Sequence, residues 1–208
     1  MKIKGLAAIC KARKRIYIYE KWTGNICTQW IGDGRAMYPI YNLPYMIEPN
    51  VQTLFDIPED KKPEYTVELK GLPDYLSDMF TDNFNEEKEV QKIYPQITIK
   101  TVPVIPMLTS TGIIFVKQQY LSALSDELEP LEYFERTIGS QTFIAIKTGF
   151  TIKALVASTL RLDKDFVENL ESLAIQCRIK FIDEELAENE DAVLNNEEII
   201  LENQNENE

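Results

Sequence analysis

The sequence predicts an α+β fold, in which antiparallel β-meanders pack against a long C-terminal helix and shorter helices, followed by a disordered acidic tail. Short segments rich in β-branched and aromatic residues alternate with turns that contain glycine, asparagine or proline, which is the pattern of antiparallel strands. Residues 163–179 instead carry apolar side chains three and four positions apart, as a helix with one buried stripe does. At 208 residues and 44% hydrophobic content, the chain can bury a full core.

The elements expected in the first half are mostly strands. They lie at residues 3–10, 15–20, 28–31, 35–40 and 65–70, with a short helix at 50–55 and an irregular or helical acidic stretch at 74–89. The segment Gly32-Asp-Gly34 lacks the further ligands of a calcium loop and does not open a helix. We therefore interpret it as a tight turn in which glycines supply positive φ.

The second half predicts another meander and the long helix. Strands are expected at residues 97–100, 102–106, 112–116, 131–137, 143–146 and 151–159, with a short helix at 117–124. Pro103 and Pro106 predict that residues 102–106 form an edge strand. We expect residues 1–182 to form a single α+β body, in which a division into two lobes would fall near residues 82–95, and residues 183–208 to form the tail.

Charge is distributed unevenly along the chain, whose net charge is −12. Residues 183–208 hold eleven acids and no base, residues 48–95 hold twelve acids and five bases, and residues 1–47 hold two acids and eight bases. A basic patch, an acidic middle and an acidic tail indicate a protein that meets its partners electrostatically.

Several function classes are excluded by residues that the sequence lacks. Without histidine there is no Ser-His or Cys-His nucleophile pair and no His-ligated metal. Phosphate-loop, dinucleotide-binding and G-x-S-x-G motifs are also absent, so we expect no cofactor. Three widely spaced cysteines, Cys10, Cys27 and Cys177, fit free thiols in a reducing cytoplasm. No run approaches the roughly 20 apolar residues that span a bilayer.

A candidate nucleic-acid site lies near the N-terminus. Lys11, Arg13, Lys14 and Arg15 supply positive charge, and Tyr17 and Trp22 follow on a predicted strand. Cations beside aromatic faces are what single-strand binders need. The alternative is an ordinary meander in which the aromatic rings fill a core or a cross-strand ladder while a loop displays solvated bases.

Two further patterns define alternative hypotheses. Asp56, Glu68 and Lys70 resemble in spacing the acidic and (D/E)-x-K elements of restriction-like nucleases, although Glu68 and Lys70 also fit the outward positions of a strand whose Val67 and Leu69 point inward. The tail contains acidic residues and an apolar island that could dock on a partner: Glu184, Glu185, Glu188, Ile199, Ile200 and Leu201.

Several segments resemble an uncharacterised group of small proteins carried by prophages and mobile elements of Gram-positive anaerobes. They are Gln29-Trp-Ile-Gly-Asp-Gly34, Tyr38-Pro39, Leu43-Pro44, Thr53-Leu-Phe-Asp-Ile-Pro58, Leu131-Glu-Tyr-Phe-Glu-Arg136 and Phe166-Val-Glu-Asn-Leu170. The resemblance implies a phage-type context. In its sheets, helices and charge distribution the chain also resembles sliding clamps, which are acidic on the outside and basic where DNA passes.

Together these observations favour a non-enzymatic, phage-type accessory protein that acts by binding, in DNA replication, recombination or their control. Its expected partners are a host or phage protein and DNA, without a membrane, in the cytoplasm of the host cell. An alternative is an acidic inhibitor that occupies a nucleic-acid-binding site of a host defence enzyme through residues 48–95 and the tail. A second alternative is a metal-dependent nuclease that uses Asp56, Glu68 and Lys70.

Overall fold

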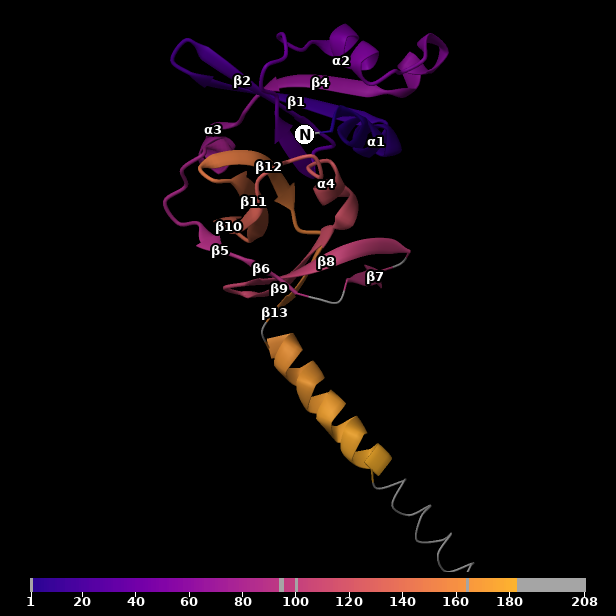
Figure 1. Cartoon of the computed structure of the whole chain (residues 1–208), viewed down its shortest axis with the longest axis vertical. Helices are drawn as coiled ribbons and strands as arrows, with labels where there is room; N and C mark the ends of the chain where they lie inside the picture. The colour runs from indigo at the N-terminus through magenta and orange to yellow at the C-terminus, as the bar shows by residue number, and fades with distance from the viewer. Residues whose placement is uncertain (1, 94–95, 100, 164, 183–208) are drawn as a thin grey trace, which may run out of the picture. The chain divides into compact units, whose positions relative to one another are not determined.

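The computed structural model describes residues 2–93, 96–99, 101–163 and 165–182, and it confirms the α+β class (Figure 1). Two sheets of mostly antiparallel strands are accompanied by short helices and by a helix at residues 165–182. Residues Met1–Leu162 form one compact unit, which includes the region near residues 82–95 where a division into two lobes would fall. The helix at 165–182 belongs to a separate unit that begins at Asp163.

The larger sheet has eight strands in the order β4-β1-β2-β3-β12-β11-β10-β5. Their bounds are β1 (Arg15–Thr23), β2 (Ile26–Gly32), β3 (Ala36–Pro39), β4 (Thr66–Gly71), β5 (Lys88–Glu89), β10 (Glu132–Ile138), β11 (Gln141–Thr148) and β12 (Thr151–Ala157). Both predicted meanders are present, and the pairing of β3 with β12 joins them. β4 pairs with β1 in parallel, which the sequence did not indicate.

The smaller sheet contains β6 (Gln91–Lys92), β7 (Ile97–Ile99), β8 (Val102–Thr109), β9 (Gly112–Lys117) and β13 (Leu160–Asp163). The prediction that residues 102–106 form an edge strand is wrong, because β8 pairs with β9 on one side and with β6 and β7 on the other. Pro103 precedes the pairing with β9, which begins at Val104, and Pro106 falls between the stretches that pair with β7 and β6. Each proline, which has no backbone N–H to donate, thus lies where β8 is paired on only one side.

The first element, α1 (Ile3–Arg13), is a helix, so the predicted strand at residues 3–10 is wrong. Leu6, Ala7 and Cys10 are three and four positions apart, and all three are buried on one face of α1. An apolar run this short satisfies helical and strand patterns alike, and burial against the sheet decides between them. Lys14 ends the helix in the left-handed conformation, with φ 53°.

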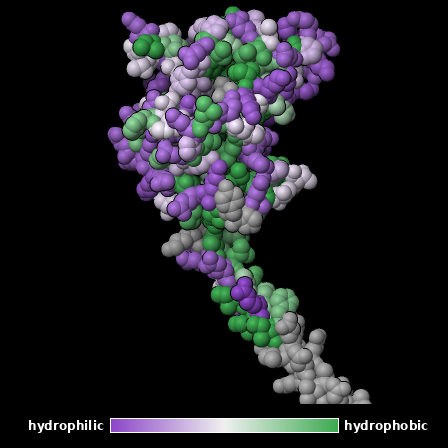
Figure 2. Space-filling view, in the orientation of Figure 1, coloured by the Kyte–Doolittle hydropathy of each residue, from purple (hydrophilic) through white to green (hydrophobic). Residues whose placement is uncertain are grey.

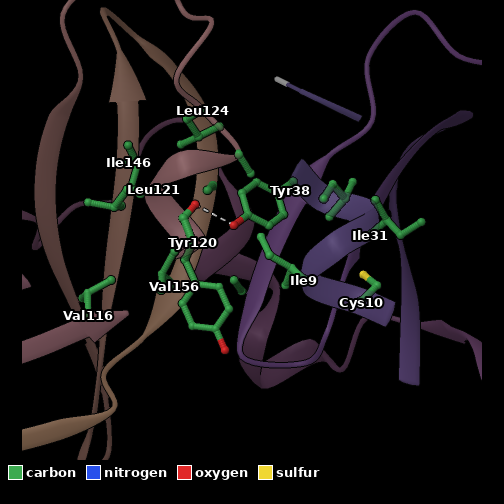
Figure 3. Close-up of a cluster of buried hydrophobic side chains, with 14 of the residues drawn as sticks. Ile9, Cys10, Ile31, Tyr38, Val116, Tyr120, Leu121, Leu124, Ile146 and Val156 are labelled. Carbon is green, nitrogen blue, oxygen red and sulfur yellow. Dashed lines mark hydrogen bonds between the residues drawn. The ribbon is translucent and has the colours of Figure 1, made fainter. Parts of the chain in front are cut away.

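Two hydrophobic clusters lie on opposite faces of the larger sheet. On one face, α1, α2 (Glu48–Leu54) and α4 (Gln118–Ser122) cover residues such as Ile31 and Val156. In Figure 3, Tyr38 lies among side chains from α1, α4 and several strands, and its hydroxyl donates to the Tyr120 carbonyl at 2.7 Å. On the other face, Trp30, Met37 and Leu155 are covered by residues of α3 (Asp74–Ser77) and η2 (Asp78–Phe80). The only further described helical turn in this unit is η1 (Glu59–Glu64).

The helix at 165–182 confirms the predicted element but not its burial. Phe166, Leu170 and Leu173 of the predicted stripe are each more than half exposed, and Leu170 has 51% of its surface accessible. Green apolar side chains therefore line the surface of this helix (Figure 2). Periodicity specifies an apolar face but not what covers it. Among the described helices, none has the length and apolar character needed to cross a membrane.

Candidate ligand-binding site

A pocket of about 490 Å³ opens on the face of the larger sheet that carries Trp30 and Met37. Its apolar wall comes from Tyr19 on β1 and from Tyr75, Leu76 and Phe80 on α3 and η2. The rings of Tyr19 and Phe80 meet edge to face, with centroids 6.3 Å apart. Tyr75 is 71% exposed, so its ring is available at the rim of the pocket.

The polar wall of the pocket contains one cationic side chain with unused bonding capacity. Arg35 is exposed, and among the described residues no hydrogen bond or ion pair engages its guanidinium. Thr142 also borders the pocket, but it alternates along β11 with Ile144 and Ile146 of the other cluster, so its side chain belongs to the opposite face of the sheet.

The turn that presents Arg35 is fixed by the buried carboxylate of Asp33. Asp33 Oδ1 accepts from the backbone N–H groups of Arg35 and Ala36, each at 2.9 Å. Gly34 adopts φ 81°, as predicted for this turn, and lies against the Tyr17 ring. Gly32 has no positive φ, which corrects the expectation for that glycine. It is required because a Cβ there would lie 1.8 Å from the Ala36 carbonyl oxygen.

Asp33 also ties the turn to the helices behind the sheet. Its Oδ2 accepts from the Tyr120 hydroxyl at 3.0 Å and lies 3.7 Å from Arg13 Nη1. Burial raises the pKa of the Tyr120 phenol and of the Cys10 thiol, and the negative charge of Asp33 adds to both effects. These groups are therefore neutral at physiological pH, and Asp33 has a structural role.

The segment around Phe80, which forms one wall of the pocket, is held in place by a buried ionic cluster. The Arg136 guanidinium is fully buried and donates to the carbonyls of Met79 and Thr81 at 2.6 and 2.7 Å. It also contacts Glu87 Oε2 at 2.6 Å, while Lys147 Nζ contacts Glu87 Oε1 at 2.6 Å. The two carbonyls flank Phe80, so this cluster positions one wall of the pocket.

The four cations of the predicted nucleic-acid site lie together at the end of α1 and the start of β1, but the fold engages three of them. Lys11 Nζ donates to the Asp56 carbonyl at 3.3 Å, and Arg13 contacts Asp33. Lys14 forms a hydrogen-bonded ion pair with Glu64, and this hydrogen bond raises the pKa of the Lys14 ammonium.

The remaining residues of the predicted nucleic-acid site lie in two places, the face of β1 that carries the pocket and the tip of the β1–β2 hairpin. Arg15, Tyr17 and Tyr19 alternate along β1 and therefore share a face, the one that carries the pocket. Arg15 has no bonded partner among the described side chains, and Tyr17 stacks on Tyr19 with centroids 6.2 Å apart. Trp22 lies beyond them, 61% exposed, near the tip of the β1–β2 hairpin.

The three residues of the nuclease hypothesis are not brought together. Asp56 follows α2, and its carbonyl accepts a hydrogen bond from Lys11 of α1. This contact lies on the face of the sheet that α1 covers, the face toward which Val67 also points. Glu68 follows Val67 on β4, so its side chain points to the opposite face of the sheet, where it forms an ion pair with Lys70. Leu69, predicted to point inward, is exposed at the sheet edge. No group of three or more metal-ligating residues occurs in the described part of the chain.

The candidate partner residues of the tail, from Glu184 to Leu201, lie outside the described residues. Sequence reasoning missed Arg35 and Tyr75, which belong to two separate segments. The alternation of Tyr17 and Tyr19 with buried isoleucines was the one signal available, because it placed both rings on one face. Comparisons with protein-family models, curated proteins and solved structures gave no match.

Proposed function

We propose that this protein acts by binding, and that its ligand is an aromatic base joined to a phosphate, either a free nucleotide or a nucleotide of single-stranded DNA. The observation that carries the proposal is the Arg35 guanidinium, without a bonded partner among the described residues, in a pocket walled by Tyr19, Tyr75 and Phe80. The pocket volume of about 490 Å³ falls in the usual range for small-ligand sites.

The chemistry of each wall matches one part of such a ligand. A base stacks on tyrosine with about 1–3 kcal/mol, whatever its sequence identity. A guanidinium binds phosphate oxygens in a bidentate manner, and it does so more strongly where water is partly excluded.

The face of β1 offers a continuation of this site for a longer ligand. Arg15 and Tyr17 precede Tyr19 on the same face, so a strand of DNA that enters the pocket would find a cation and a stacking ring beside it. This arrangement supports the accessory role in DNA replication, recombination or their control that the sequence led us to expect. It moves the proposed contact from Lys11, Arg13 and Lys14 to Arg15 and Arg35.

Fluorescence anisotropy with a labelled oligothymidylate and calorimetry with mononucleotides test the proposal. We expect Arg35→Ala and Tyr75→Ala each to weaken binding about tenfold, and Arg35→Ala to reduce the salt dependence by about one counterion. Lys61→Ala removes an equal charge from η1 and serves as the matched control.

The two ligand sources are separated by their relative affinities. Tight binding of the oligonucleotide with weak binding of mononucleotides identifies single-stranded DNA, and the reverse identifies a free nucleotide. Equal affinities of the Arg35→Ala and Lys61→Ala variants would contradict the proposal. Failure of both probes to bind would also contradict it and leave the acidic-inhibitor hypothesis.

A further inference from the structure

We propose that the helix at 165–182 pairs, in antiparallel orientation, with the same helix of a second copy of this chain. The helix carries an apolar stripe of Phe166, Leu170, Leu173, Ala174, Cys177 and Phe181. The intervals between these six residues are four, three, one, three and four, so they read the same in both directions, and Val167 lies at the flank of the stripe outside this pattern. Large members of the stripe are exposed in the single chain.

A palindromic stripe is complementary to itself when two helices run in opposite directions. Alignment at the centre of the stripe sets Phe166 opposite Phe181, Leu170 opposite Cys177, and Leu173 opposite Ala174 of the second copy. Each contact then occurs twice, as a twofold interface requires, and a large side chain meets a small one at the centre. The spacing of three and four is that of knobs-into-holes packing.

The second apolar strip of the helix does not have this property. Ile175, Ile179 and Ile182 are exposed on a different side, at intervals of four and three. Under the same antiparallel alignment their opposite positions would be Ser172, Glu168 and Asp165, which are polar. The symmetric pairing is therefore assigned to the stripe that contains Leu170 and Leu173.

Charge complementarity favours the same orientation. Glu171 and Arg178 are seven residues apart, on one flank of the stripe. A twofold axis perpendicular to the helices sets this flank beside its own copy, so that Glu171 of each chain lies near Arg178 of the other. A parallel pair would instead place the two copies of this flank on opposite sides of the interface, so that Glu171 of one chain could not meet Arg178 of the other.

The sequence after the helix adds a second electrostatic argument. Residues 183–208 carry eleven acids and no base. In a parallel pair, both acidic segments would leave from the same end and repel each other. In an antiparallel pair they leave from opposite ends of a helix about 27 Å long, well beyond the Debye length of about 8 Å at physiological salt.

Sedimentation equilibrium of the full chain is the first test. We expect dimers that dissociate over about 1–200 µM, because one helix face is a small interface. Leu173→Glu should raise the dissociation constant at least about tenfold, because it buries a charge at the centre of the interface. Ser172→Glu adds the same charge to the polar side and should leave the dissociation constant unchanged. A chain that stays monomeric over the whole range would overturn the proposal.

Disulfide trapping, in a Cys27→Ser background, tests the orientation. In the antiparallel pair the two Cys177 residues are roughly 10 Å apart along the axis, which is too far for a disulfide, whereas a Leu170→Cys variant has a thiol opposite Cys177. We expect mild oxidation to cross-link the Leu170→Cys variant and not its parent. Cross-linking of the parent through Cys177 would identify a parallel pair and overturn the proposal.

A charge exchange separates direct pairing from a folding defect. Glu171→Arg and Arg178→Glu should each weaken the dimer, and the double variant should restore it, because only the relative position of the two charges matters. If the double variant is weaker than either single variant, the two residues do not face each other. The helix would then contact some other surface, and the proposed pairing would be refuted.

Discussion

Replacement of Glu87 by alanine is the most informative test of how the pocket is built. The Glu87 carboxylate binds both the Arg136 guanidinium and the Lys147 ammonium, and these two cations are 0% and 7% exposed. Glu87→Ala leaves both without a counter-ion. Removal of one partner from a buried ion pair costs about 3–5 kcal/mol, because the remaining charge stays desolvated.

The lower end of that range applies here. The Glu87 side chain is 15% exposed, so water would reach part of the vacated site and solvate the cations. We therefore expect a loss of about 3 kcal/mol in the free energy of unfolding, or a fall in Tm of roughly 6–12 °C for a domain of this size. Ligand binding should weaken as well, because Arg136 would lose part of what holds the carbonyls around Phe80.

Urea unfolding, followed by tryptophan fluorescence, measures this loss, since Trp30 packs edge to face on Phe80 with centroids 4.7 Å apart. Glu86→Ala changes an exposed neighbour and should shift the free energy by less than about 0.5 kcal/mol. The double variant Glu87→Ala, Lys147→Met should regain at least about 1 kcal/mol of the free energy of unfolding, because one of the two unpaired buried cations is removed. A cost of Glu87→Ala no larger than that of Glu86→Ala would refute the role of the cluster.

Three further outcomes are expected. Burial raises the pKa of the Tyr38 phenol well above its usual value of about 10, so this phenol ionises in the unfolded chain before it does in the folded chain. Above about pH 10 its share of the fall in the free energy of unfolding should be about 1.4 kcal/mol per pH unit, so alkaline titrations should show a less steep fall in Tyr38→Phe than in the parent. In dilute native protein a thiol reagent should modify Cys177 and spare Cys10 until denaturant is added; early modification of Cys10, located by mass spectrometry, would contradict its burial. Gly32→Ala should abolish folding, judged by circular dichroism, because its Cβ would lie 1.8 Å from a carbonyl oxygen of β3.

Local patterns predicted most strands of the sheets but not which strands pair. The period-two alternation of Ile16 and Ile18 with Tyr17 and Tyr19 is a property of one segment, and it predicted β1 correctly. The parallel pairing of β1 with β4 joins segments about fifty residues apart, and no local pattern encodes it. The same limit explains the error at α1, where a short apolar run forms a helix because of the sheet it covers.

The candidate site was predictable only in part, because its residues come from four separate regions. Tyr17 and Arg15 were named from the sequence and lie on the face of the pocket, whereas Lys11, Arg13 and Lys14 were named for their charge. Charge in sequence does not reveal whether a cation is already paired, and acceptors at Asp33, Asp56 and Glu64 bind these three. Burial and bonding in the folded chain therefore distinguish a structural cation from one available to a ligand.

The position of Arg35 shows how the core and the candidate site depend on each other. Asp33 is 1% exposed, and a carboxylate is buried at acceptable cost only when its oxygens are fully hydrogen-bonded. The backbone of the turn satisfies Oδ1, and Tyr120 and Arg13 satisfy Oδ2, so the turn cannot move without leaving the charge unsolvated. Arg35 belongs to this fixed turn through its own backbone N–H, so it lines the pocket from a rigid backbone position. Arg13 thus helps to fix the backbone that presents Arg35, a structural role that its position in a basic run does not reveal.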